Sequence, residues 1–318
     1  MRSAVAFQLY RSAKRRQLLE ELVALKKNRV VKYAHVLNCQ DCEGEYLQNC
    51  KNCINCFDVS NSEDCCNVMT ADAAKDIFNS CYVGYKSELA ADSIAMAEIY
   101  NIKHCYSVFR SSDVEYGDCV MNSKNIFGCV SLNKKEYCIL NKQYTKEDYF
   151  ELRAKIIEHM KKNGEWGKFL PENMSCYGYN ESTANDYYPL SEAEALKQGF
   201  KWSHSPSLNS PAAAQEISGE LPDNIYEADD DILAKPVLCE ASGKPFRILK
   251  QELEFYRKHR LPLPRVHSEE RYKLRQSLRN PLKLWSRACA KCSSPIRTSY
   301  SPDRPETVYC EQCFLKEV

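Results

Sequence analysis

The 318-residue sequence predicts a multidomain protein of mixed α+β class, with a cysteine-rich repeat region built like a β-solenoid, a helical cap and a small C-terminal module. Three observations lead to this prediction. Twelve of the 18 cysteines lie in one quasi-repetitive segment, and a segment of helical periodicity follows it. Two Cys-x2-Cys pairs near the C-terminus have the spacing of a zinc ribbon.

Composition excludes several classes of protein. The formal net charge is +1, so no global field favours nucleic acid or membrane surfaces. No apolar run approaches the ~18 residues of a membrane span, and the N-terminal segment lacks the apolar region of a signal peptide. Eighteen cysteines without an export signal indicate a reducing compartment. We therefore expect a cytoplasmic protein with no membrane partner, and the sequence identifies no small-molecule substrate.

Residues 1–37 are predicted to form a basic amphipathic helix. Nine Lys and Arg residues stand against Glu20 and Glu21. Apolar side chains recur near helical spacing, at Leu18, Leu19, Leu22, Val23 and Leu25. The simplest interpretation is a solvated helix that docks on the next domain, and a nucleic-acid contact is the alternative.

Residues 38–144 are predicted to form the solenoid. The sequence KDIFNSC recurs as KNIFGC, and cysteine-led repeats follow one another at intervals of 10 and 9 residues, beginning at Cys119, Cys129 and Cys138. Asn tolerates the left-handed conformation that a tight corner needs, and Cys packs as a small hydrophobe. These features are typical of stacked solenoid turns. The spacing is irregular over 86–99, where we expect a helix or an inserted loop.

Residues 145–202 change to helical periodicity. Thr145 marks a helix start and Gly164 a stop, and Ser191 with Glu194 forms a capping box for a second helix. Because the open end of a solenoid has to be covered, we expect these helices to form its cap.

Residues 203–235 are predicted to be an acidic linker. Seven acids lie between residues 216 and 231 with no Lys or Arg among them. A flexible tether is the simplest interpretation, and the alternative is a segment that folds back on a basic surface of the same chain.

Residues 287–318 are predicted to be a zinc ribbon with four cysteine ligands. Two knuckles can place four thiolates around one Zn²⁺ and leave no open coordination position, with the ligands Cys289, Cys292, Cys310 and Cys313. A closed site has no place for a reactive water, so we expect one structural rather than catalytic zinc.

Residues 236–286 are predicted to be a degenerate zinc finger followed by a basic helix. The segment resembles the small "probable zinc-ribbon" domains, because it keeps their Gly243, Phe246 and the helix QELEFY before a final Pro-rich stretch. Ser242, His267 and Glu270 stand where that pattern has cysteine. The resemblance implies a finger that lost its metal and kept its apolar core, with Cys239 and His267 as candidate residual ligands.

Ordered motifs along most of the chain carry a wider resemblance. They include FGCVSLNKKEYC, IIEHMKKNGEWG, GKPFRILKQELEFYRKHRLPLPR and YSPDRPETVYCEQC. The chain resembles a family of cysteine-rich, multi-zinc-ribbon proteins of uncultivated small-genome bacteria. This resemblance implies the same architecture and brings no established activity.

A second group of cysteines has metal-like spacing. A candidate second metal site is formed by Cys39, Cys42, Cys50 and Cys53. Together with Cys56, the later cysteines also have the spacing of an incomplete iron–sulfur run. The alternative, which we favour, is that they begin the solenoid as packed core residues.

The region from 257 to 287 carries the strongest local positive charge. Ten Lys and Arg stand against two acids, and aromatic residues lie among them. Candidate nucleic-acid-binding residues are Lys258, Arg260, Arg265, Arg271, Lys273, Arg275, Arg279 and Trp285. A solvated helix surface that pairs with the acidic linker is the competing interpretation.

Catalytic motifs are sparse in this sequence. The six histidines form no HExxH and no paired-cysteine deaminase setting, and there is no P-loop or GxSxG. We therefore predict a zinc-containing, non-enzymatic protein that contacts RNA or DNA through its basic C-terminal module. The alternative is a protein–protein interaction scaffold that uses the solenoid face, and a zinc-finger nuclease is the third hypothesis.

Overall fold

The computed structural model describes residues 12–27, 29–204 and 221–317. The first eleven residues of the predicted N-terminal helix and residues 205–220 of the predicted linker lie outside this description. The chain divides into two compact units. One comprises Val30–Cys176, Pro281–Arg304 and Val308–Val318, and the other Met1–Arg29, Tyr177–Asn280 and Pro305–Thr307.

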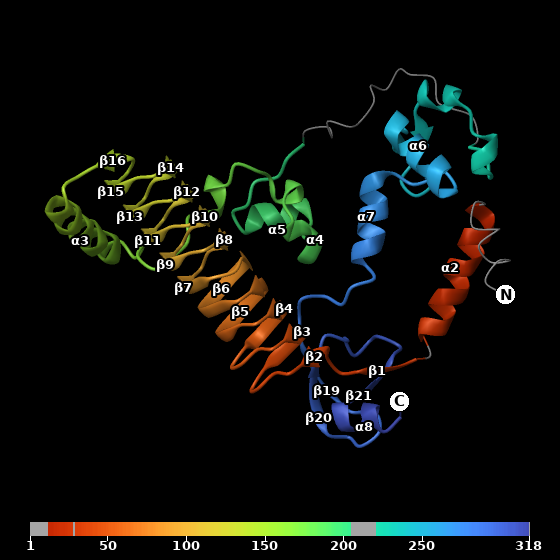
Figure 1. The fold of residues 1–318 in the computed structure, drawn as a ribbon, viewed down its shortest axis with the longest axis horizontal. Helices are drawn as coiled ribbons and strands as arrows, with labels where there is room; N and C mark the ends of the chain where they lie inside the picture. The colour runs from red at the N-terminus through yellow and green to blue at the C-terminus, as the bar shows by residue number, and fades with distance from the viewer. Residues whose placement is uncertain (1–11, 28, 205–220, 318) are drawn as a thin grey trace. The chain divides into compact units, whose positions relative to one another are not determined.

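The solenoid of the first unit has about nine turns (Figure 1). All its ladders are parallel except the last, between β15 and β16. Its strands are β2 (Val36–Leu37), β3 (Glu43–Gln48), β4 (Ile54–Ser60), β5 (Glu63–Asp72), β6 (Ala74–Val83), β7 (Ser87–Ala91), β8 (Ile94–Ala97), β9 (Tyr100–Lys103), β10 (Tyr106–Phe109), β11 (Ser112–Glu115), β12 (Asp118–Met121), β13 (Lys124–Phe127), β14 (Val130–Asn133), β15 (Glu136–Ile139) and β16 (Lys142–Gln143).

One turn of the solenoid contains 12 residues, as the pairings Tyr106↔Asp118 and Ser112↔Lys124 show. The expected repeats of 10 and 9 residues are therefore not turns, because Cys129 and Cys138 lie on adjacent sides of the coil. The expectation of a helix or loop over 86–99 is wrong. One extra residue between β6 and β7 lengthens this turn to 13 residues, and the coil continues through β7 and β8.

A left-handed corner at every third residue gives each turn four short sides. In one turn the corners are Asn49, Asn52, Asn55 and Asp58, all with φ between 52° and 56°. The residue after each corner points into the core, here Cys50, Cys53, Cys56 and Val59. Asn and Asp tolerate this conformation better than other residues with a side chain. Corner side chains of adjacent turns also bond to one another, as Asn49 Nδ2 does to Asn61 Oδ1 at 3.0 Å.

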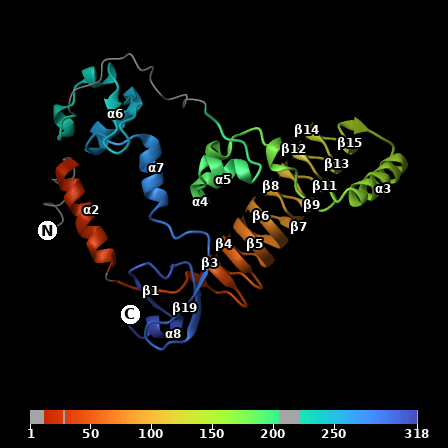
Figure 2. The same cartoon turned by 180° about the vertical axis from the view of Figure 1, so that it is seen from behind.

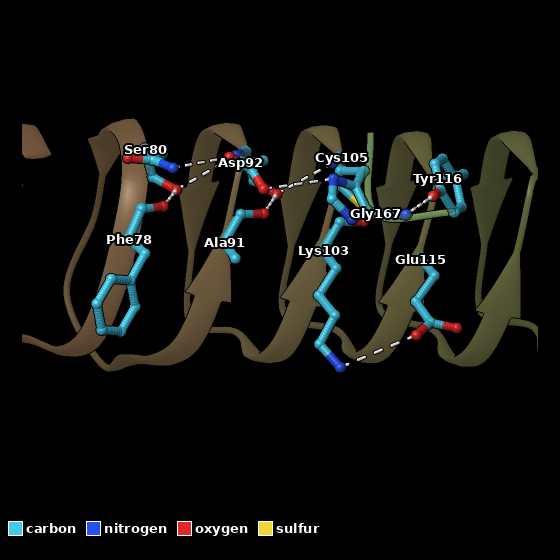
Figure 3. A network of polar contacts seen from close by, with 12 residues as sticks. Phe78, Ser80, Ala91, Asp92, Lys103, Cys105, Glu115, Tyr116 and Gly167 are labelled. Carbon is cyan, nitrogen blue, oxygen red and sulfur yellow. Dashed lines mark hydrogen bonds and ion pairs between the residues drawn. The ribbon is translucent and has the colours of Figure 1, made fainter. Parts of the chain in front are cut away.

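Cysteine and serine have the same role on the inner side of the coil. Ser80 Oγ donates to the Phe78 carbonyl at 2.7 Å, and Cys105 Sγ donates to the Lys103 carbonyl at 3.1 Å (Figure 3). Ser80 Oγ also accepts from the Ser93 amide of the next turn, and Cys105 Sγ accepts from the Gly117 amide of the turn after its own. These side chains therefore satisfy backbone groups that would otherwise be buried without a partner.

Both ends of the solenoid carry a packed element, as the two views show (Figures 1 and 2). At the last turns, α3 (Lys146–Lys162) packs on Phe127 and Ile139 through Tyr149. Thr145 accepts from Asp148 N as its N-cap, and the left-handed Gly164 follows the helix. The buried Glu115 carboxylate accepts from Arg153 Nε at 2.8 Å and fixes α3 to the coil.

The predicted helical cap is divided between the two units. Only α3 and the short helix η1 (Glu172–Met174) belong to the solenoid unit, whereas α4 (Ala184–Tyr187) and α5 (Glu192–Lys197) belong to the other. The capping box of Ser191 and Glu194 is present at the start of α5, as the sequence predicts.

The second unit contains the degenerate finger. Its N-terminal helix α2 (Ser12–Lys27) ends ten residues before the predicted limit, and Arg16 pairs with Glu240 at 3.2 Å. The remaining elements are η2 (Tyr179–Glu181), η3 (Ile225–Glu227), η4 (Asp230–Leu233), β17 (Val237–Leu238), β18 (Pro245–Phe246), α6 (Lys250–His259) and α7 (Ser268–Gln276).

The described part of the predicted linker, 221–235, is not a free tether. Leu221, Ile225 and Ile232 join the core of the finger with Phe246 and Leu253. No helix among the described residues is both long and apolar enough to cross a membrane.

Candidate metal centre and charged surfaces

The two Cys-x2-Cys knuckles form a compact sulfur cluster. The first knuckle follows β19 (Trp285–Ala288) and precedes β20 (Pro295–Thr298), which pairs with β19 as a hairpin. The second follows β21 (Thr307–Tyr309) and begins α8 (Glu311–Leu315). The four Sγ atoms all lie within 4.8 Å of one another, and those of Cys292 and Cys310 are 3.7 Å apart.

This geometry fits a tetrahedral zinc site. Four sulfurs at a Zn–S distance of about 2.3 Å are separated by about 3.8 Å. Among the described residues, no other group of three or more His, Cys, Asp or Glu ligand atoms comes this close together. The four residues could therefore hold one metal ion.

Hydrogen bonds favour the thiolate form of Cys289 and Cys292 in the first knuckle, whereas burial raises the pKa of Cys313 in the second to about 12. Burial acts to raise the pKa of the Cys289 thiol, but N–H groups of Cys310, Cys292 and Lys291 together lower it to about 6. Hydrogen bonds from the Ser294 side chain and amide lower the pKa of Cys292. Because a thiolate is the form that binds metal, the loop geometry prepares this site for a cation.

The ribbon is completed by the chain segment that leads into the solenoid. β1 (Val30–Lys32) pairs with β21, and Val31 packs in one core with Cys289, Ile296 and Val308. The Thr298 hydroxyl donates to the Tyr33 carbonyl at 2.6 Å. The predicted helix over 1–37 is thus replaced by a strand here, because Val30–Lys32 finds a β partner far along the chain.

A charged contact joins the ribbon to the first turn of the coil. Arg297 in β20 donates to the Glu43 carboxylate in β3 at 3.1 Å. A metal at the four cysteines would therefore stabilise the N-terminal end of the solenoid.

The degenerate finger has the same knuckle with Cys239 as the remaining cysteine of the four ligand positions. Cys239 N donates to Lys244 O, as Cys289 N does to Ser294 O, and Gly243 and Ser293 occupy matching left-handed positions. His267 N donates to Cys239 Sγ at 3.2 Å, as Cys310 N does to Cys289 Sγ.

The candidate residual ligands Cys239 and His267 have other roles. His267 Nδ1 accepts from Glu269 N at 3.2 Å and caps α7, and its ring packs edge-on against Phe246. The apolar core of the finger therefore stabilises the fold at the position where a metal would otherwise bind.

The upstream cysteines lie within the solenoid. Cys50 and Cys53 are buried, and Cys39 and Cys42 are half-buried and donate to the carbonyls of the residues two before them. Burial raises the pKa of Cys42 to about 11. The structure does not bring these four sulfurs together as the ribbon sulfurs are, and at neutral pH Cys42 is a protonated donor.

Two of the eight predicted nucleic-acid-binding residues are engaged inside the second unit. Arg265 donates to Leu221 O and pairs with Glu240, and Arg271 contacts Tyr256 and Glu252.

The remaining candidates are more exposed. Lys273 pairs with Glu270 one turn away, and Arg275 lies 6.0 Å from the Tyr272 ring. Arg279 lies after α7, and Lys258 and Arg260 are exposed at the end of α6. Trp285 belongs to the ribbon in the other unit, where Lys283 lies over its ring.

A basic groove that the sequence reasoning missed runs along the solenoid. It has a volume of about 870 Å³ and is lined from several successive turns. Its cations are Lys86, Arg110, Lys124, Lys134 and Lys135. A 12-residue repeat would have revealed it, because Lys86, Arg110 and Lys134 lie two turns apart.

No protein-family model and no curated protein matches this chain.

Proposed function

We propose that this chain is a zinc-stabilised, non-enzymatic binding protein whose solenoid groove is the binding surface. The observation that carries the proposal is the groove of about 870 Å³, formed by side chains from successive turns of one regular coil. Residues on a regular coil stand at fixed spacing, which suits the recognition of an elongated ligand.

Zinc is the proposed metal of the ribbon. Tetrahedral sites with four cysteine ligands are typical of structural zinc, and the pairs have zinc-ribbon spacing. We also propose a cytoplasmic location, supported by 18 cysteines that are all free of disulfides. The sequence motifs support membership of the cysteine-rich, multi-zinc-ribbon family.

A photo-crosslinking experiment tests the groove. Tyr100 lines it, whereas Tyr106 lies half a turn away, and both are 48% exposed. Benzoylphenylalanine placed at Tyr100 is expected to trap a macromolecule in cells, and the same group at Tyr106 serves as the matched control. Equal adducts at both positions, or none at Tyr100, would contradict a binding role for the groove.

Nucleic-acid contact through the second unit is a second candidate. Lys258 and Arg260 are exposed, and neither makes an ion pair with any residue that the structure describes. Changing Lys258, Arg260 and Arg275 to neutral residues is expected to weaken RNA binding if this surface is used, as measured by fluorescence anisotropy. Unchanged affinity would exclude it.

A further inference from the structure

One wall of the groove is a column of corner residues stacked from five turns. Lys86, Glu98, Arg110, Asn122 and Lys134 all have φ between 48° and 56°. Their stacking is fixed by backbone hydrogen bonds between turns, such as Arg110 N to Ala97 O at 3.0 Å and Lys134 N to Met121 O at 3.1 Å. Because successive turns lie about 4.8 Å apart, the three cations repeat every ~10 Å.

The groove has an excess of positive charge. Lys124 and Lys135 add two cations, and neither they nor Lys86 and Lys134 make an ion pair with a described residue. The lining acids are Glu98, whose carboxylate lies 3.7 Å from Arg110, and Glu136. Five cations against two acids make the surface complementary to an anionic chain.

An aromatic face lies within the same groove. Tyr100 is the aromatic residue among the lining side chains, and about half of its surface is exposed. Cations along a groove together with a free aromatic ring are the combination that binds single-stranded nucleic acid, because phosphates pair with the cations and a base stacks on the ring. In a duplex the bases stack on one another and offer no face to the tyrosine.

We propose that the solenoid groove binds single-stranded nucleic acid, with Lys86, Arg110 and Lys134 on phosphates and Tyr100 stacked on a base. This inference rests on the proposed function of the solenoid as a binding surface. It assigns nucleic-acid binding to the coil rather than to the basic helices of the second unit.

The test uses the full chain and a variant that removes charge without disturbing the fold. Asn favours the left-handed corner, and the equivalent corners of the first turns are Asn38, Asn49 and Asn61. The triple variant K86N/R110N/K134N is therefore expected to keep the thermal unfolding midpoint. Fluorescein-labelled 15-nucleotide single-stranded RNA and DNA, read by anisotropy at several salt concentrations, are the probes.

The triple variant is expected to bind at least 10-fold more weakly. Its log–log salt slope should fall by about 2, since each phosphate contact on a single strand contributes about 0.7. Tyr100→Ala is expected to lose roughly 5-fold or more in affinity with an unchanged salt slope, because stacking is not ionic.

The matched control removes three cations from the second unit. K258N/R260N/R275N is expected to change affinity by less than about 2-fold. If this control loses binding and the groove variant does not, the inference is overturned. It is also overturned if heparin binds and no oligonucleotide does, or if a protein crosslinks at Tyr100 and the oligonucleotides fail to bind; in both cases the groove remains a binding surface.

Discussion

Asparagine and aspartate occupy many of the left-handed corners that separate the three-residue sides of this coil. Placing an ordinary side chain in the left-handed region costs about 1–2 kcal/mol, and the solenoid does so at every third position. Asn and Asp reduce this cost through local hydrogen bonds, and they recover more by bonding to the next turn, as Asn55 does to Asn67 at 2.8 Å. The left-handed corners therefore account for the many Asn and Asp residues of the solenoid.

Replacing Cys105 tests the equivalence of inward cysteine and serine. Its Sγ accepts from Gly117 N at 3.2 Å and donates to Lys103 O, and Ser93 does the same one turn earlier. We expect Cys105→Ser to leave the urea midpoint close to that of the wild type. Cys105→Ala would leave the Gly117 amide without its partner and destabilise by about 1–3 kcal/mol. Equal shifts for both variants would contradict this role of the thiol.

His104 is expected to make the solenoid acid-sensitive. Burial lowers its pKa although Asp92 and Glu115 act to raise it, and the ring stacks on Tyr116 at 5.0 Å. His104 therefore binds a proton more readily in the unfolded chain than in the folded one as the pH falls below about 6.5. The contribution of His104 to the free energy of unfolding is complete above that pH and decreases below it.

The variant His104→Asn suits the left-handed position and has no titrating group. Its thermal midpoint is expected to depend less on pH between 5 and 7 than that of the wild type. An unchanged pH dependence would show that another group is responsible.

At the scale of elements, two copies of one knuckle differ in how they are stabilised. The ribbon offers four sulfurs from its two knuckles, whereas the finger has Ser242, His267 and Glu270 in place of three of them and a core built around Phe246 and Leu253. The backbone hydrogen bonds of the turn are the same in both. A metal and an apolar core are thus alternative ways of closing the same short loop.

Restoring the missing cysteines should therefore restore a metal site. The variant S242C/H267C/E270C is expected to raise the zinc content from one to two per chain, as measured by native mass spectrometry. Cys310 already caps α8 at the matching position, so a cysteine is compatible with the helix start. Ser242→Cys alone, with two of four ligands, should stay at one zinc; a single zinc in the triple variant would contradict the shared geometry.

At the scale of the whole molecule, the ribbon and α3 stabilise opposite ends of one coil. Zinc removal is expected to raise amide exchange in β1, β20, β21 and the first turns near Glu43, because their shared core loses its metal. Exchange in α3 should not change, since Arg153 and Glu115 fix it without metal. Cys292→Ser should reproduce the effect and Cys176→Ser, at an exposed free thiol, should not. Uniform exchange changes along the coil would contradict this local role.

The sequence predicts the solenoid and the ribbon ligands because each depends on local spacing, whereas the degenerate knuckle is what the resemblance to small zinc-ribbon domains implies. The 12-residue turn escapes detection since inward positions accept Cys, Ser, Ala, Val and Ile alike, so no single residue type marks the period. The pairing of β1 with β21 is also not predictable, because it joins segments far apart in the sequence whose contact depends on the fold. The basic groove is visible in the sequence only when the 12-residue period is known, so it was not predicted either.

The closure of the first turns by the ribbon has a consequence for biosynthesis. Glu43 precedes Cys313 by 270 residues, so at 5–20 residues per second the first turns wait roughly 15–50 seconds for their partner to be translated. During that interval the β1 segment is an open strand able to pair with other chains. A metal bound once Cys313 has been translated would therefore close the ribbon and cover this strand.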